Sequence, residues 1–504
     1  MADRRHGYDV SVGYPASFFP QLAPNWLDFC IRVQGFDPQR TGPSYRYADM
    51  GCGPGFHLCL LAAANPQAEF VGIDFDTNIK HGHNLAAAAG LTNVSFARAD
   101  FVDLATSWPT ELGTFDYLVF QGVLSWVSPE VRAAAFQCVA QASKSGTVAS
   151  FGYNIPPGWL SSVPFQHVAN QFGKRRGADA AIAGAFAMFR RLTDANAQLF
   201  GQMKPQLDVM AAQPLTYLAH EFLPDHWAPL WHSEVAQQLR QVDFTYVGSA
   251  TVAEALLPNS LPPELASIIK EQPDDSLRQD IQDIVIVQRL RRDIFCREPR
   301  PARSNALEGD TPIFLLSPPQ EGAPVHFRTT FGGLMVDYDA VADILAAIAD
   351  GPKPLATLMA LQNSAPARQD TRSIILSMLN AQMITVGDPS PGSAEIAERF
   401  NAAVARAAAG GESYLNLAAA ALGSGAPVTE MDLLLLDAWL SAGRDIGPED
   451  LADGVAQRLK HLGRQLQFRG SPIGDQQLRS HIAGLAPIFF DQLVPQWRRL
   501  GVLQ

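Results

Sequence analysis

The sequence of 504 residues lacks any uninterrupted apolar stretch approaching the ~20 residues needed to cross a bilayer. Its first residues, MADRRHGYDV, are charged and lack the apolar segment of a secretory signal. Cysteine is scarce and never in CxxC spacing: the residues are Cys30, Cys52, Cys59, Cys138 and Cys296. An odd count of scattered cysteines argues against a disulfide framework and a zinc site. We therefore expect a cytoplasmic protein with reduced thiols, no metal and no membrane insertion.

Positively charged residues are fewer than negatively charged ones. The 38 Lys and Arg residues face 50 Asp and Glu residues, which gives a formal net charge of −12. This balance argues against a general affinity for nucleic acid or anionic lipid. Hydrophobic residues make up 47% of the chain, which is ordinary for globular proteins and excludes wholesale disorder. A chain of this length is expected to form about two to four domains.

Residues 46–154 alternate between apolar strands and helical stretches, which predicts an α/β fold with a Rossmann-like parallel sheet. The strands are expected at YRYADM, EFVGIDF, VSFARAD, FDYLVFQG and TVASFGYN. The helix after the second strand should end at Gly90, and another should begin with Ser128 as its cap and Pro129 at its first position.

The remaining segments predict an arrangement around that sheet. Two later apolar runs, at 242–250 and 292–298, are interpreted as the last two strands of the same sheet. The expected units are an N-terminal cap segment (1–45), a helical insertion that covers the substrate (155–240), the end of the core sheet (241–300), a winged-helix-like domain that begins with the hairpin VHFRTTFGGLMVD (301–390) and a helical C-terminal domain (391–504).

A glycine-rich turn, Asp49-Met50-Gly51-Cys52-Gly53-Pro54-Gly55, lies between the first predicted strand and helix. Glycines at these positions let the backbone bend tightly and approach a ligand, and the helix start beyond them offers unpaired N–H groups. Either a pyrophosphate or the carboxylate and amino group of S-adenosylmethionine suits such a turn. In the second case Asp49, at the strand end, accepts from the ligand ammonium.

Acids at the next two strand ends favour S-adenosylmethionine. Asp74 is placed to take both ribose hydroxyls, and Asp100 with Phe101 suits an adenine. The GxGxxG spacing of nicotinamide enzymes is absent. The alternative is that these aspartates only cap loops. The predicted cofactor-binding residues are Asp49, Gly51, Cys52, Gly53, Gly55, Asp74, Phe75, Asp100, Phe101 and Gln121.

These residues resemble the motifs of class I S-adenosylmethionine-dependent methyltransferases. Further stretches resemble the bacterial subgroup that carries a methyltransferase regulatory domain: YPASFFPQLAPNWL, QGVLSWV, YNIPPGW, YLAHEFLPDHWAPLWHSEVAQQL, YVGSA and DIVIVQRLRRDIFCRE. The best-known members of that subgroup resemble protein lysine methyltransferases acting on bacterial outer-membrane proteins. The resemblance spans most of residues 14–300 and is looser beyond, where YLNLAAAALGSG departs from the expected form.

The methyl acceptor is expected beyond the fourth and fifth strands. This region supplies Gln121, Ser125, Trp126, Tyr153, Asn154 and Trp159. Aromatic rings there suit a methylammonium group, or they simply fill the core. Tyr14 is predicted to fold over the cofactor as a lid, and His220 with Glu221 to accept a proton or clamp the substrate, or to form a structural pair. The candidate catalytic residues are Tyr14, Trp126, Tyr153, His220 and Glu221.

The leading hypothesis is an N-methyltransferase that modifies lysine side chains of a protein. The Asn/Asp-Pro-Pro-aromatic motif of amide and nucleobase N-methyltransferases is absent after the fourth strand. A small-molecule methyltransferase, as in a secondary-metabolite pathway, is the closest alternative. A protein that keeps S-adenosylmethionine as a sensor ligand is the third, and the negative net charge argues against nucleic acid as its partner. A homodimer is compatible with each.

Overall fold

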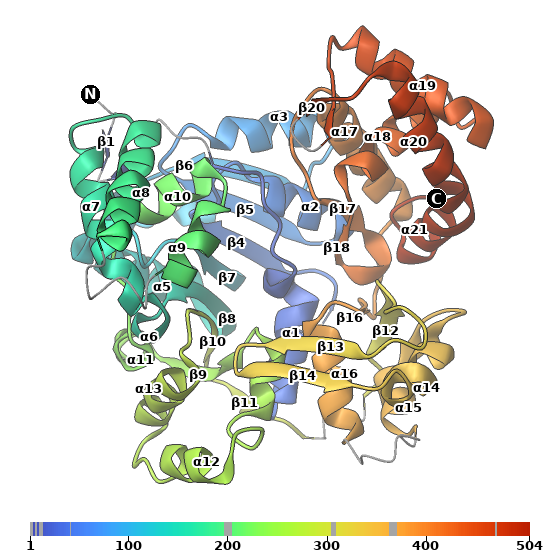
Figure 1. The fold of residues 1–504 in the computed structure, drawn as a ribbon. Helices are drawn as coiled ribbons and strands as arrows, with labels where there is room; N and C mark the ends of the chain where they lie inside the picture. The colour runs from blue at the N-terminus through green and yellow to red at the C-terminus, as the bar shows by residue number, and fades with distance from the viewer. Residues whose placement is uncertain are drawn as a thin grey trace.

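The structure is a computed structural model of the 504-residue chain. It describes residues 4–5, 8–9, 14–40, 42–195, 204–303, 309–361, 370–468 and 471–504. Figure 1 shows a central sheet with the 155–240 region at one end and the two C-terminal units stacked on the opposite side.

A seven-stranded sheet forms the centre of the molecule, in the order β6-β5-β4-β7-β8-β10-β9. Its first five strands run parallel, and β10 runs antiparallel to both of its neighbours. The prediction that the two late apolar runs complete this sheet is confirmed. The strands are β4 (Arg46–Met50), β5 (Glu69–Asp74), β6 (Val94–Arg98), β7 (Phe115–Gln121), β8 (Ser143–Asn154), β9 (Phe244–Ser249) and β10 (Leu290–Arg297).

Helices cover both faces of the sheet, which explains why its central strands are buried along almost their whole length. One face packs against α1 (Pro24–Val33), α2 (Phe56–Ala64) and α3 (Ile79–Ala89). The other packs against α4 (Phe101–Thr106), α5 (Pro129–Ala142) and α11 (His232–Arg240).

The helix limits agree with the sequence at two places. Helix α5 begins as predicted, because the Ser128 hydroxyl accepts from the Val131 N–H at 3.2 Å and Pro129 follows. Helix α3 ends at Gly90, whose φ of 65° lies in the left-handed region that a C-terminal cap requires.

The segment between β8 and β9 forms a helical layer with its own apolar core, around Phe165, Phe189 and Phe222. Its helices are α6 (Pro156–Trp159), α7 (Val163–Gly173), α8 (Ala178–Asp194), α9 (Lys204–Ala211) and α10 (Leu215–Phe222). Two more helices, α12 (Pro263–Lys270) and α13 (Asp275–Ile286), connect β9 to β10.

Beyond residue 300 the chain forms two further units. The first contains the predicted hairpin, which is confirmed as β13 (Val325–Thr329) and β14 (Gly332–Val336). With it are β12 (Pro312–Leu315), α14 (Asp339–Ile348), β15 (Lys353–Pro354), α15 (Leu355–Met359), α16 (Thr371–Asn380) and β16 (Ile384–Val386). The second is mainly helical, with α17 (Ala394–Ala409), β17 (Asn416–Ala419), β18 (Ser424–Pro427), α18 (Glu430–Ser441), α19 (Pro448–His461), α20 (Asp475–Ile488) and α21 (Val494–Leu500).

Six two-residue strands form three further pairs among the described residues. They are β1 (Arg4–Arg5) with β2 (Tyr8–Asp9), β3 (Phe36–Asp37) with β11 (Arg300–Pro301), and β19 (Gln467–Phe468) with β20 (Ser471–Pro472). The β3–β11 pair ties the N-terminal segment to the chain just after the central sheet ends.

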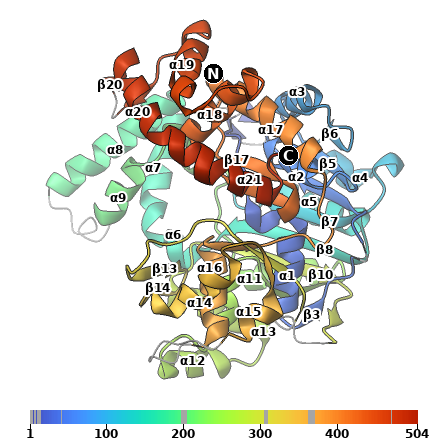
Figure 2. The same cartoon turned by 90° about the vertical axis from the view of Figure 1, so that its right-hand side faces the viewer.

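The C-terminal units share one hydrophobic core with the α1–α3 face of the sheet. Phe56 of α2 meets Phe400 of α17 with ring centroids 6.2 Å apart. A Cβ on Gly425 of β18 would come within 2.7 Å of the Phe18 ring, so this strand approaches the N-terminal segment closely. Figure 2 shows α17 and α21 lying against the side of the sheet that carries α2. Removing either unit would expose part of this core.

Among the described residues, none of the helices combines the length and apolarity that crossing a bilayer demands. The five cysteines are all buried, and none of them forms a disulfide in the structure. No group of three or more His, Cys, Asp or Glu side chains within the described ranges is arranged to hold a metal ion.

Candidate active site

A cleft of about 550 Å³ opens at the carboxyl ends of β4, β5 and β7. The sheet forms its floor, α10 of the helical layer forms one wall, and residues 14–19 of the N-terminal segment lie across it. Ligands of open parallel sheets bind at this edge, because strand ends and the loops after them converge there. The cleft contains most of the side chains that the sequence singled out.

The glycine-rich turn shapes the floor of the cleft. Gly51, Gly53 and Gly55 have φ angles of 90°, 53° and 77°, all in the left-handed region that favours glycine. A Cβ on Gly51 would lie 2.6 Å from Val123, and one on Gly55 would strike the Phe96 ring. A Cβ on Gly53 would meet nothing within 4 Å, so the cleft leaves space above this backbone for a ligand.

Asp49 ends β4 and is the most isolated acid of the cleft. Its side chain is 5% exposed and has no hydrogen-bond partner among the described residues. Burial, together with the charge of Asp74, raises the pKa of its carboxyl to about 8. A ligand ammonium beside Asp49 would supply the missing partner and favour the charged form.

Asp74 and Asp100 hold backbone as well as lining the cleft. The Asp74 carboxylate accepts from the N–H groups of Gly53 and Asp76, each at 2.8 Å. Asp100 caps α4 by accepting from Val102 at 3.0 Å. The capping role of these two acids is therefore observed, and their cofactor-binding role stays a prediction. Burial raises the pKa of Asp74, although the Asp76 and Gly53 N–H groups lower it.

Two further buried polar atoms in the cleft have no partner within the described part of the chain. They are Oε1 of Gln121, at the end of β7, and Nε1 of Trp126 in the loop that follows. Buried polar atoms are normally paired, so unpaired ones in a cleft mark positions that a ligand satisfies. With Asp49 and the open space above Gly53, they fit a polar, positively charged ligand such as S-adenosylmethionine.

Glu221 lies at the far end of the cleft, on α10. Its Oε1 accepts from Nδ2 of Asn154 at 2.8 Å and from Nε1 of Trp227 at 3.0 Å. The side chain is 4% exposed, and burial raises its pKa to about 7, although those two donors lower it. A carboxyl with a pKa near neutrality can take up and release a proton at physiological pH.

Aromatic side chains surround Glu221. The rings of Tyr14 and His220 stack, and Trp159 carries the Arg289 guanidinium carbon 3.8 Å from its ring centroid. The Trp159 indole N–H donates to the Arg289 carbonyl at 2.8 Å. Tyr217, whose hydroxyl interacts with Glu221, is 40% exposed, so the cleft reaches the protein surface beside Glu221.

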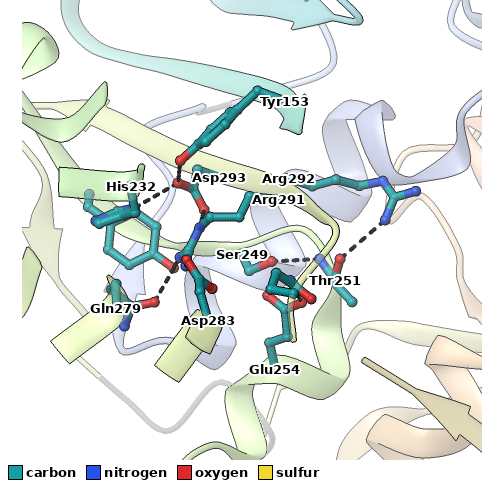
Figure 3. A network of polar contacts seen from close by, with 12 residues as sticks. Tyr153, His232, Ser249, Thr251, Glu254, Gln279, Asp283, Arg291, Arg292 and Asp293 are labelled. Carbon is teal, nitrogen blue, oxygen red and sulfur yellow. Dashed lines mark hydrogen bonds and ion pairs between the residues drawn. The ribbon is translucent and has the colours of Figure 1, made fainter. Parts of the chain in front are cut away.

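Tyr153 does not belong to this cleft, contrary to the expectation for a catalytic residue. It is fully buried, and its hydroxyl donates to Asp293 of β10. Asp293 also pairs with His232 at 2.8 Å and with Arg291 at 2.8 Å, in the network that Figure 3 shows. Burial opposes the charge on Asp293, but Arg291 and His232 outweigh it and hold the pKa at about 2.

The structure thus separates the sequence candidates into two groups. Gly55 and Tyr153 lie outside the lining of the cleft, where Gly55 permits close packing of α2 against Gly82 and Phe96. The residues that line it are Tyr14, Asp49, Gly51, Cys52, Gly53, Asp74, Phe75, Asp100, Phe101, Gln121, Trp126, His220 and Glu221. Sequence reasoning missed Tyr217 and Arg289, which also line it, and Trp227, which holds Glu221. All three lie in stretches that resemble the methyltransferase subgroup, but no motif within those stretches singles them out.

Comparison with family models agrees with this geometry. The model described as a methyltransferase domain matches residues 42–148, which include the glycine-rich turn and the three strand-end acids. This chain is an S-adenosylmethionine-dependent methyltransferase. A second model, described as a predicted methyltransferase regulatory domain, matches residues 214–297. In the methyltransferase that region supplies α10, with Glu221, and the last two strands of the sheet.

Relatives resemble the methyltransferase along its whole length. It is 25% identical over 517 residues to the uncharacterized protein sll1526 of Synechocystis, with 98% of this chain and 99% of that protein covered. Among solved structures, PKMT2 from Rickettsia typhi has a TM-score of 0.70 at 16% identity, covering 97% of this chain and 99% of that one. The same protein in complex with AdoHcy gives a TM-score of 0.67. The shared fold therefore includes both C-terminal units.

Proposed function

We propose that this methyltransferase transfers a methyl group to the ε-amine of a lysine side chain in a protein. The observation that carries the proposal is Glu221, a buried carboxyl with a pKa of about 7 at the aromatic, surface-reaching end of the cleft. The resemblance to protein lysine methyltransferases and the likeness to PKMT2 over the whole chain support it.

The cofactor-binding residues proposed are those at the strand ends. Asp49 would pair with the amino group of S-adenosylmethionine, the backbone above Gly53 would accommodate its carboxylate end, and Asp74 would accept from its ribose. Asp100 and Phe101 would hold the adenine. Bound there, S-adenosylmethionine supplies a sulfonium methyl group that an uncharged amine can attack.

The acceptor end must turn a lysine ammonium into an amine, because the charged form has no lone pair. A free lysine has a pKa near ~10.4, so at neutral pH the site must remove a proton. Glu221 would accept it as the ammonium enters, and the aromatic walls would exclude water and lower the pKa of the amine further. Trp126, Tyr14 and Trp159 would attract the methylated ammonium product by cation–π contacts of about 0.5–2 kcal/mol each.

The charge of the cleft favours a basic acceptor. Its described lining contains five acidic residues, Asp49, Asp74, Asp76, Asp100 and Glu221, against one arginine, Arg289. A cationic ligand favours the charged form of those acids whose pKa is raised, Asp49 and Glu221 among them. A small-molecule acceptor is the second candidate, and the observation that favours it is the apolar and aromatic character of most other lining residues.

An experiment with labelled cofactor distinguishes the lysine acceptor from the small-molecule acceptor. The enzyme is incubated with S-adenosyl-[methyl-³H]methionine and fractionated cell extract, and acid hydrolysates of the protein fraction are analysed for methyllysine. We expect label in methyllysine with the wild type and at least a hundredfold less with Glu221→Gln, while cofactor binding is retained. Label confined to the small-molecule fraction would exclude the lysine proposal and support the second candidate.

A further inference from the structure

A second cavity, of about 280 Å³, lies where four segments distant in sequence meet. It is separate from the cofactor cleft, and the two share no lining residue. Its walls come from the start of α1, the adjoining ends of β9 and β10, the β13 hairpin with α16, and the β17–β18 hairpin. The central sheet and both C-terminal units therefore contribute to one pocket.

The charge of this cavity is opposite to that of the whole chain. Among the described residues that line it are two arginines, Arg292 and Arg328, and no aspartate or glutamate. The chain as a whole carries a net charge of −12. Hydroxyl and amide side chains complete the polar lining, including Thr251, Asn380 and Asn416. The lining itself therefore has a net positive charge, and Glu254 lies behind it, where its carboxyl accepts from the lining Thr330 at 3.1 Å.

Arg292 is the more constrained of the two cations. Its guanidinium makes a single side-chain hydrogen bond, 3.4 Å from Nη1 to the Thr251 hydroxyl (Figure 3), and no described carboxylate lies within ion-pair distance. Burial lowers the pKa of the Arg292 guanidinium, and the charge of the more distant Glu254 raises it by less. Its neighbour Arg291, in contrast, is paired with both Asp283 and Asp293. A half-buried guanidinium that lacks a carboxylate suits an anion from solution.

Arg328 supplies the second cation from a different part of the chain. It lies on the exposed side of β13, and no ion pair holds it within the described ranges. Its carbonyl accepts from Nδ2 of Asn380 at 3.0 Å, which fixes the hairpin to α16 at the wall of the cavity. Guanidinium groups donate in a planar fork that matches phosphate and carboxylate oxygens.

The geometry points to a binding site for a small metabolite that carries an oxyanion, either a phosphate or a carboxylate, held between Arg292 and Arg328. The same N-terminal segment lines both cavities: residues 14–19 contact the cofactor cleft, and residues 20–26 contact this one. Trp26 donates to the Ala250 carbonyl at 2.8 Å, and Asn25 donates to the Leu422 carbonyl. An anion bound here adds contacts to that segment and so stabilises the observed placement of residues 14–19 across the cofactor cleft.

Binding is tested on the full-length enzyme by calorimetry and thermal unfolding. The probes are inorganic phosphate, glycerol 3-phosphate and citrate, each compared with chloride at equal ionic strength. We expect at least one probe to bind and to raise the midpoint of unfolding, and Arg292→Gln and Arg328→Gln to weaken that binding at least tenfold. Arg399→Gln, an exposed arginine of α17, is the matched control and should bind like the wild type.

The phosphate and citrate arms identify which class of oxyanion is preferred. A Kd for S-adenosylmethionine that falls at least threefold in the presence of the bound probe, in the wild type but not in Arg328→Gln, supports the coupling. If no probe binds beyond chloride, or if both arginine variants bind as well as the wild type, the site does not exist. If a probe binds without changing the cofactor Kd, the coupling through residues 14–26 is wrong. Arg328 is exposed, so its variant tests the site even if Arg292→Gln does not fold.

Discussion

The rings of Tyr14 and His220 lie parallel, with centroids 4.0 Å apart and 8° between their planes. One comes from the N-terminal segment and the other from α10, and both line the cofactor cleft. This stack joins two walls of the cleft that are far apart in sequence. It is a contact that fastens the N-terminal segment to the helical layer.

We expect Tyr14→Ala and His220→Ala each to lower kcat/KM, and the double variant to lose less than the sum of the two. A stacked pair contributes about 0.5–1.5 kcal/mol beyond its buried area, so the coupling energy in a double-mutant cycle should fall in that range. Tyr14→Phe keeps the ring and is the control, with a loss of no more than a few-fold. Additive losses would show that the stack does not couple the two walls.

Replacing Asp74 by alanine should weaken cofactor binding by about 10–100-fold, the usual effect of losing hydrogen bonds to a charged group of about 1.5–3 kcal/mol. The change removes the proposed ribose contact and also the bonds that hold Gly53 and Asp76. Calorimetry with S-adenosylmethionine measures the affinity. Asp103→Ala, an exposed acid on α4, is the matched control. Unchanged affinity in Asp74→Ala would remove this residue from the site.

Cofactor binding should release protons near neutral pH. With a pKa of about 8, the Asp49 carboxyl is mostly protonated at pH 7 in the free enzyme. An ammonium beside it favours the carboxylate, so binding expels a proton, and affinity rises as pH increases from about 6 to 8. Calorimetry at pH 7 in two buffers of different ionisation enthalpy counts the protons. Asp49→Asn should release none, and equal release in this variant would assign the proton to another group.

The pH profile of the reaction should report Glu221. Its carboxyl must be ionised to accept a proton, and its pKa is about 7, so kcat/KM should rise with pH and level off above that value. Glu221→Gln should lower the rate at neutral pH by about 10²–10⁴-fold and remove the step at pH 7. Measuring kcat/KM from pH 5.5 to 9 tests this. A step that persists in Glu221→Gln belongs to a different residue.

The buried network around Asp293 should matter for stability rather than for binding. Asp293→Ala removes an anion that pairs with Arg291 and His232, which leaves buried positive charge with fewer partners. Such a loss costs about 3–5 kcal/mol in the free energy of unfolding, measured by urea denaturation. Asp275→Ala, whose exposed acid pairs with Arg278 one turn along α13, should cost less than about 1 kcal/mol. Equal losses in the two variants would mean that the network contributes no more than a surface ion pair.

The floor of the cleft could be predicted from the sequence because it obeys simple topology. Parallel strands deliver their carboxyl ends to one edge of a sheet, so Asp49, Asp74 and Asp100 had to meet once the strands were recognised. Strand β9 was also recognisable as a short apolar run, and β10 from the apolar residues IFC near its end. In these cases the local pattern contains all the information that is needed.

For Tyr153 this topological reasoning gave a wrong prediction, because the residue does not line the cleft. Successive residues of a strand point to opposite faces, so Tyr153 and Asn154 cannot both face the cleft. Asn154 reaches Glu221, and Tyr153 turns to Asp293 instead. Trp227 and Arg289 were missed for another reason: they come from loops without periodicity, and only the packing of the helical layer brings them to the site.

The position of β10 has a consequence for biosynthesis. Within the described part of the chain, strand β9 lies at the edge of the sheet and pairs with β10 alone, which follows it by about 40 residues. On the ribosome β9 is therefore made before its only partner, and its backbone donors and acceptors stay unsatisfied until α12, α13 and β10 have emerged. Because domains fold as they leave the ribosome, the catalytic half should close only after residue 297 is free, and a nascent chain halted earlier would carry an open edge prone to aggregation.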